Sequence, residues 1–122
     1  MGLVLALHHV NVTVPPDAEA EAKNFYGNVL ELEQLSKPAG TRSSGGWYQI
    51  GPNQLHLSVK TEGRGSLTGH VCLTVSDLSA AENRFREAGV EIIPDPRPIE
   101  GTSRFYVRDP GGNMLEIVQA VS

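Results

Sequence analysis

The chain has 122 residues, of which 39% are hydrophobic and 20% are charged, a composition typical of one globular domain rather than of a disordered segment. A formal net charge of −4 without any run of Lys or Arg argues against a nucleic acid as partner, and no apolar stretch is long enough to cross a bilayer. Cys72 is the only cysteine, so no internal disulfide can form and a reducing, cytoplasmic location is expected.

The first half of the chain predicts one helix among four strands, in the order β-α-β-β-β. Alternating apolar residues indicate a strand from about Ala6 to Val14, and Pro15-Pro16 ends it because proline cannot donate to a ladder. A helix is expected next, because its apolar residues recur at helical spacing: Ala18, Ala22, Phe25 and Val29. The remaining strands are expected at about 30–35, 47–50 and 54–59.

The second half predicts the same order of elements after a polar, glycine-containing linker at 61–69. Its helix is expected to begin near Ser76-Asp77, with Ser79-x-x-Glu82 as a possible capping box, and to end at Gly89. Strands are expected before and after this helix, at about 70–75, 90–93, 104–108 and 113–118.

The two halves are related by an internal repeat. His9-Val10-Asn11-Val12-Thr13-Val14 returns 61 residues later as His70-Val71-Cys72-Leu73-Thr74-Val75. The turn and strand that end each half also coincide in glycine, asparagine and leucine, at Gly51 to Leu55 and at Gly111 to Leu115. The repeat predicts a single α+β domain made of two βαβββ units, at about 5–60 and 69–120.

Four side chains that can bind a metal occupy repeat-related positions. His9 and His70 begin the first strand of each half, and His56 and Glu116 take the same place in the last strand. Because strand side chains alternate and the aliphatic neighbours face the helices, all four are predicted on the opposite face. Burying such groups is unfavourable unless they are paired or coordinated. Imidazole and carboxylate ligands predict a divalent transition metal, Zn, Ni, Fe, Mn or Co, and a hydrogen-bonded polar cavity is the alternative.

The chain resembles the vicinal oxygen chelate superfamily, which includes glyoxalase I, fosfomycin-resistance proteins, extradiol dioxygenases and bleomycin-resistance proteins. The motifs that carry the resemblance are His9-Val10, Asn24 to Leu30 at the end of the first helix, Gly69-His70-Val71, and Arg104 to Glu116. The resemblance covers nearly the whole chain. It implies two βαβββ units whose sheets curl around a metal at the four positions above. It also implies a small-molecule substrate and a homodimer, with the site inside one chain or shared across two.

One position departs from the pattern of glyoxalase I, which carries Glu or Gln where this chain has His56. A neutral fourth ligand changes the charge of the site and removes one candidate base. Fosfomycin-resistance proteins and extradiol dioxygenases use two His and one Glu, which His70 and Glu116 could supply together with either His9 or His56.

The mechanism that the superfamily implies is chelation of two adjacent substrate oxygens by the metal, with Glu116 as base for a proton next to a carbonyl. Arg42, Arg104 and Trp47 are expected to bind the substrate. The leading hypothesis is a divalent-metal-dependent lyase or isomerase of glyoxalase type. An Fe(II) extradiol-type dioxygenase and a non-catalytic, antibiotic-type binding protein stay open as alternatives.

Overall fold

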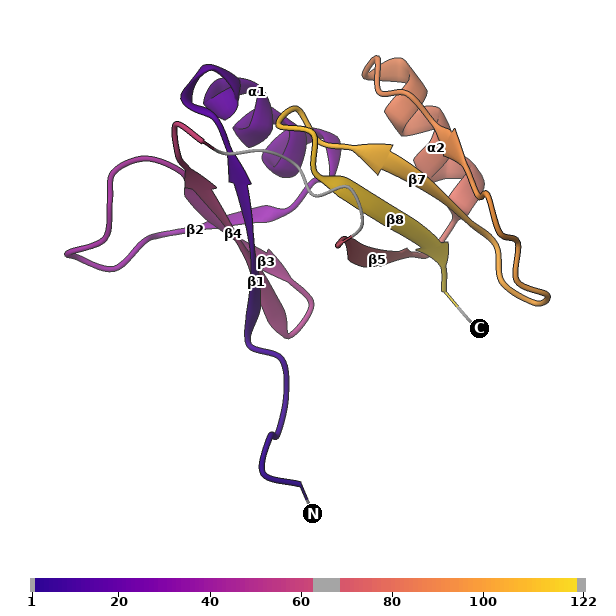
Figure 1. The fold of residues 1–122 in the computed structure, drawn as a ribbon, viewed down its shortest axis with the longest axis horizontal. Helices are drawn as coiled ribbons and strands as arrows, with labels where there is room; N and C mark the ends of the chain where they lie inside the picture. Colours follow the sequence, from indigo (N-terminus) through magenta and orange to yellow (C-terminus); the bar gives the residue numbers. More distant parts are fainter. Residues whose placement is uncertain (1, 63–68, 121–122) are drawn as a thin grey trace.

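A computed structural model describes residues 2–62 and 69–120, which form two four-stranded sheets with a helix against each (Figure 1). The strands are β1 (His9–Val14), β2 (Glu33–Leu35), β3 (Gly46–Ile50), β4 (Asn53–Val59), β5 (Val71–Val75), β6 (Ile93–Pro94), β7 (Arg104–Arg108) and β8 (Met114–Gln119). The helices are α1 (Glu19–Asn24), which continues into a π-helical turn at Phe25–Val29, and α2 (Leu78–Glu87). A 3₁₀ turn at Pro16–Ala18 precedes α1.

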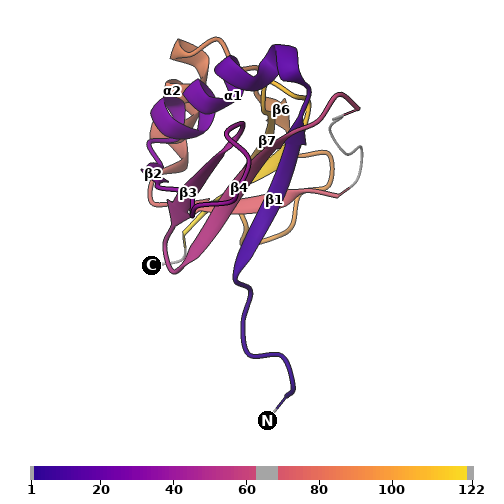
Figure 2. The same cartoon turned by 90° about the vertical axis from the view of Figure 1, so that its left-hand side faces the viewer.

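The two sheets have the same topology. Their strand orders are β1-β4-β3-β2 and β5-β8-β7-β6, and in each sheet the first strand pairs in parallel with the last while the other pairs are antiparallel. Both helices lie on the same side of the molecule, as the two perpendicular views show (Figures 1 and 2). The predicted α+β fold of two βαβββ units is therefore confirmed. The part of the linker expected at 63–68 lies outside the described residues.

The N-terminal segment before β1 extends away from the body of the protein (Figure 1). The first strand begins at His9 rather than near Ala6. Its partner β4 begins only at Asn53, and the two residues before Asn53 form a turn that offers no strand to pair with. The apolar side chains of the segment are consequently between 61% and 99% exposed: Leu3, Val4, Leu5 and Leu7. Within the described ranges, no helix is long and apolar enough to cross a membrane.

The start of α2 differs from the expected capping box. Asp77 is the N-cap, and its carboxylate accepts a hydrogen bond from the backbone N–H of Ala80 at 3.1 Å. Glu82 instead forms an ion pair with Arg86 one turn later, at 2.9 Å. The prediction based on Ser79 was wrong because the helix already begins at Leu78, which makes Asp77 its N-cap.

The two units pack across a shared hydrophobic core, which contains residues of both sheets and both helices. At one edge of this core the buried Tyr26 hydroxyl donates to the Asp109 carboxylate at 2.6 Å. The Asn113 amide donates to the Thr13 carbonyl at 3.0 Å, which joins the turn after β7 to β1. Burial, followed by the charge of Asp109, raises the pKa of Tyr26 well above its usual value, so this phenol stays protonated. These contacts fix the orientation of one sheet relative to the other.

Glu31 occupies a backbone conformation that favours glycine, with φ of 60°, one residue beyond the C-cap Leu30 of the π-helical turn. The corresponding residue after α2 is Gly89, with φ of 77°. Glu31→Gly is expected to stabilise the protein by about 0.5–1 kcal/mol, because removing the Cβ relieves the left-handed strain. The ion pair lost with Arg84 is long, at 3.9 Å, and exposed, so its contribution is small. Urea denaturation measures the change, and a destabilised Glu31→Gly variant would contradict this account.

Candidate functional site

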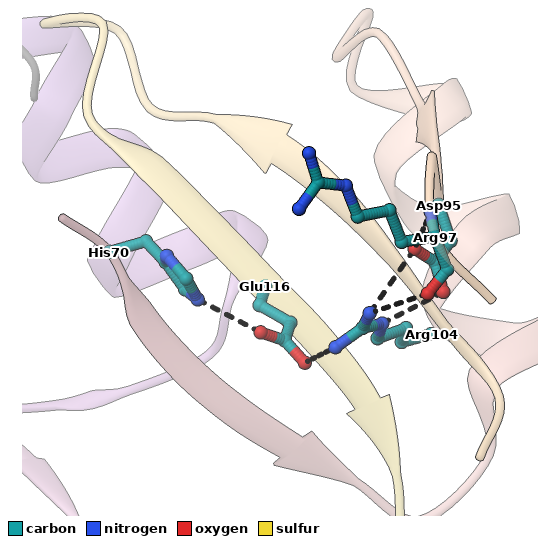
Figure 3. A network of polar contacts seen from close by, with 5 residues as sticks. All are labelled: His70, Asp95, Arg97, Arg104 and Glu116. Carbon is teal, nitrogen blue, oxygen red and sulfur yellow. Dashed lines mark hydrogen bonds and ion pairs between the residues drawn. The ribbon is translucent and has the colours of Figure 1, made fainter. Parts of the chain in front are cut away.

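The second sheet carries a continuous chain of polar contacts across β5, β8 and β7 (Figure 3). His70 precedes β5, and its Nε2 lies 2.9 Å from Oε1 of Glu116 on β8. Because a carboxylate only accepts, this nitrogen carries the proton. The other oxygen of Glu116, Oε2, accepts from Nη1 of Arg104 on β7 at 3.1 Å. Arg104 in turn binds both carboxylate oxygens of Asp95, at 2.8 and 3.3 Å.

The electrostatics of this chain keep Glu116 ionised. Glu116 is only 8% exposed. Burial raises the pKa of its carboxyl, but hydrogen bonds from Arg104 and His70, together with the charge of Arg104, outweigh that effect and hold the pKa below its usual value. The hydrogen bond with Asp95 raises the pKa of Arg104 and lowers that of the aspartate. Both partners therefore stay charged across the physiological range.

Two further residues of the second sheet border this chain. Tyr106 lies opposite Glu116 on β7, and its ring meets the His70 ring edge to face with 5.8 Å between centroids. Cys72 lies opposite Glu116 on β5 and is solvent exposed. Although the residue is exposed, partial desolvation of its sulfur, followed by the charge of Glu116, raises the pKa of the Cys72 thiol. The thiol is thus protonated at neutral pH, which disfavours a nucleophilic role.

The first sheet carries a stack of three rings instead of a chain of charges. His56 on β4 lies between Trp47, with centroids 4.0 Å apart and planes 2° from parallel, and His9, with centroids 4.0 Å apart and planes at 15°. Trp47 and His56 are opposite each other in the β3–β4 ladder, which explains their contact. The ring of His9 also contacts His8, whose Nδ1 lies 2.8 Å from Nδ1 of His9.

His56 is positioned by hydrogen bonding as well as by stacking. Its Nε2 lies 2.8 Å from Oε1 of Gln54, two residues earlier on the same face of β4. His56 is 8% exposed, the same value as its repeat counterpart Glu116. Burial, followed by the charges of His9, His8 and Lys37, lowers the pKa of His56. The imidazole is therefore neutral near pH 7, the form that can bind a metal.

A cavity of about 350 Å³ opens beside His56 and Trp47, under the loop between β2 and β3. Its lining includes Lys37, Arg42 and Lys60, and it contains no carboxylate. The Lys37 ammonium donates to two carbonyls of the loop, those of Arg42 and Ser44. The cavity thus combines an aromatic wall with positive charge, which suits an anionic small molecule.

The structure brings the four predicted metal ligands together as two pairs, one on each sheet. His9 contacts His56 by ring stacking, and His70 contacts Glu116 by a hydrogen bond. Among the residues that the structure describes, no group of three or more His, Cys, Asp or Glu side chains is assembled that could hold a metal ion. Of the predicted substrate-binding residues, Trp47 and Arg42 line the cavity on the first sheet, whereas Arg104 lies on the second.

Sequence reasoning missed three residues that contact candidate site residues: Gln54 beside His56, Tyr106 beside His70, and Asp95 beside Arg104. Gln54 and Tyr106 each lie two positions from a residue already singled out, His56 and Arg104, so strand alternation could have identified both. Asp95 carried no such signal, because it lies in an irregular loop nine residues before Arg104.

Comparison with known proteins identifies the family to which this fold belongs. The chain matches the family model of the Glyoxalase/Bleomycin resistance protein/Dioxygenase superfamily over residues 6–117. A lactoylglutathione lyase of Pseudomonas aeruginosa is 33% identical over 106 residues, which cover 86% of this chain and 53% of that protein. The chain thus spans about half the length of this curated relative.

Two solved structures are similar over nearly the whole chain. A glyoxalase-family protein of Bacillus anthracis has a TM-score of 0.88 at 28% identity, and the match covers 99% of both chains. A variant of the fosfomycin resistance protein FosX of Listeria monocytogenes, solved with Mn(II) and dihydroxypropylphosphonic acid, has a TM-score of 0.83 at 14% identity, covering 98% of this chain and 95% of that one. The second likeness concerns the fold alone. Since the family match spans most of its length, this protein belongs to the glyoxalase/bleomycin resistance protein/dioxygenase superfamily.

Proposed function

We propose that the protein is a divalent-metal-dependent lyase or isomerase of glyoxalase type, which binds a small substrate through two adjacent oxygens. The observation that carries this proposal is the His70–Glu116 pair, whose facing nitrogen and oxygen are 2.9 Å apart. Two neighbouring ligands at right angles, each about 2.1 Å from a metal, would lie about 3 Å apart. The spacing of this pair therefore fits two ligands of one ion, once the proton between them is lost.

The other two proposed ligands, His9 and His56, fit a metal by their chemistry but not by their present orientation. Parallel stacked rings direct their nitrogens side by side rather than toward one point, and Nε2 of His56 is occupied by Gln54. Metal loading would require both rings to turn: the exposed position of His9 allows this, whereas the buried His56 would have to give up its hydrogen bond to Gln54. Three imidazoles and one carboxylate favour Zn, Ni, Fe, Mn or Co.

We also propose that the protein acts as a homodimer, in which the first-sheet pair of one copy meets the second-sheet pair of another. The separation of the two pairs supports a shared site, because neither pair alone supplies enough ligands. The exposed apolar segment 2–8 supports association, since an uncovered group of leucines favours burial against another chain. The single cysteine fits a cytoplasmic location.

In the proposed reaction the chain's own residues bind the substrate and move its proton. A bound divalent ion would act as a Lewis acid that stabilises negative charge on the substrate oxygens. Glu116, already ionised, would take the proton next to the carbonyl. Arg42 and Trp47 would hold an anionic substrate in the cavity. Within the described residues, hydrogen bonds engage four of the five N–H groups of Arg104, and the remaining one, on Nη1, would be available to the substrate.

A second candidate function is metal-free binding of a planar small molecule, of the antibiotic-binding type. The cavity on the first sheet favours it, because the stacked rings of Trp47 and His56 border it together with the cationic side chains of Lys37, Arg42 and Lys60. In this alternative the His70–Glu116 pair would be a structural ion pair.

Elemental analysis of protein purified without chelator, followed by activity tests with added Zn²⁺, Ni²⁺, Fe²⁺, Mn²⁺ and Co²⁺, separates these functions. The lyase proposal expects about one metal per site and metal-dependent turnover of the hemithioacetal of methylglyoxal and glutathione or a related 2-oxoaldehyde adduct. Protein that binds none of these metals would contradict it and favour the binding function. Oxygen uptake with a panel of catechols would instead indicate a ring-cleaving dioxygenase.

A further inference from the structure

We propose that Asp95 and Arg104 form a positioning pair that orients Glu116 toward the metal site, a role that rests on the metal-dependent function proposed above. Neither residue needs to touch the ion. Arg104 lies between two carboxylates and contacts both of them (Figure 3). Residues that hold a metal ligand in place influence metal affinity without contacting the ion.

The Arg104 guanidinium is fixed by several contacts at once. Its Nε and Nη2 bind the two oxygens of Asp95, its Nη2 also donates to the Arg97 carbonyl at 3.0 Å, and its Nη1 donates to Glu116. The side chains of Arg104 and Asp95 are only 13% and 11% exposed, so water screens the pair weakly. A planar guanidinium held by a fork of two oxygens has little rotational freedom.

Asp95 is the residue that makes this arrangement rigid. Its Oδ1 also accepts a hydrogen bond from the backbone N–H of Arg97 at 2.9 Å, so the carboxylate is anchored to its own loop. Without Asp95, the guanidinium would keep the Arg97 carbonyl, Glu116 and the face of the Tyr106 ring as partners, but would lose the two-point contact that fixes its orientation. It could then rotate about its long side chain, and the contact with Glu116 would become one of several alternatives.

The contact from Arg104 decides which oxygen of Glu116 is available. Because Oε2 accepts from Arg104, Oε1 is left directed toward His70, at the spacing expected of a second ligand. On the first sheet, the corresponding residue His56 is held differently, by stacking on Trp47 and by a hydrogen bond to Gln54. Each unit of the repeat thus positions its final-strand residue by its own means, one with rings and the other with paired charges.

Three variants test the inference: Asp95→Asn, Arg104→Lys and Arg97→Ala. Asp95→Asn removes the negative charge that anchors the guanidinium. Arg104→Lys keeps the positive charge but lacks the paired N–H groups that bind both oxygens of Asp95. Arg97→Ala is the matched control, because it removes a cation from the same loop while the backbone carbonyl used by Arg104 remains. Two readouts are compared in each variant: the affinity for Mn²⁺ and Ni²⁺ by calorimetry, and the ¹⁵N chemical shifts of the His70 ring in metal-free protein.

Asp95→Asn is expected to weaken metal binding by about ten- to a hundredfold and to change the His70 shifts, with a smaller effect of the same kind for Arg104→Lys. Arg97→Ala should leave both readouts as in the wild type. Unchanged metal affinity and unchanged His70 shifts in Asp95→Asn would overturn the inference. If Asp95→Asn does not fold, the same two measurements on Arg104→Lys decide the question. If the wild type binds neither metal, the proposed function fails, and the His70 shifts alone decide whether the pair positions Glu116.

Discussion

Replacing Glu116 with glutamine is expected to lower kcat/KM of the metal-loaded protein by at least about a hundredfold. The carboxylate is both the proposed base, whose loss typically lowers rates by about 10²–10⁴, and the only anionic ligand of the proposed set. Glutamine has nearly the same shape, and Asp95 still holds Arg104 in place, so the fold should persist. Steady-state kinetics combined with metal analysis measure both consequences.

The matched control for this variant is Glu91→Gln, which removes the same charge from an exposed residue outside the site. Its kcat/KM and metal content should equal those of the wild type. A Glu116→Gln variant that binds metal and turns over substrate as the wild type does would show that Glu116 has neither role. Loss of metal without any change in the melting temperature of metal-free protein would support the ligand role specifically.

Replacing Gly111 with alanine is expected to destabilise the protein by about 2–3 kcal/mol and to lower its melting temperature by roughly 10 °C. A Cβ at this position would lie 2.3 Å from Cγ1, 2.8 Å from Cβ and 3.2 Å from Cα of Val14. Val14 is fully buried, and the contact with its backbone cannot be relieved by rotating its side chain. Because Gly111 belongs to the turn that joins the second unit to β1, the strain would act on the junction between the two units.

Gly51, the repeat counterpart of Gly111, provides the control. A Cβ on Gly51 would meet nothing within 4 Å, so Gly51→Ala should lose only the about 1 kcal/mol that the left-handed conformation imposes on alanine. The double variant Val14→Ala/Gly111→Ala should be less destabilised than the sum of its single variants, because the smaller residue makes room for the new methyl group. Thermal denaturation of these four variants beside the wild type measures the differences in stability. Equal effects of Gly111→Ala and Gly51→Ala would contradict the steric explanation.

The repeat was sufficient to predict the fold class, because strand alternation and helical spacing depend on neighbours along the chain. It also predicted that His56 and Glu116 occupy equivalent places, and the two residues have the same exposure. Boundaries were less accurate where they depend on a distant partner. The first strand begins at His9 because β4 provides no partner before Asn53, a fact that the sequence around Ala6 does not contain.

The contacts of the candidate site depended on tertiary structure to a greater degree. Stacking of His56 on Trp47 requires the register of β3 against β4, and the role of Asp95 requires a loop to fold over β7. The register of β3 against β4 follows from the two-residue turn between Ile50 and Asn53, whereas the path of the loop that carries Asp95 has no local signature. By itself, the sequence determined the family resemblance, the two units and the candidate ligands, because these follow from residue types at regular spacing. Only the tertiary structure decided that the four candidate ligands form two separate pairs and that Arg104 is held by Asp95, because both depend on how segments distant along the chain pack together.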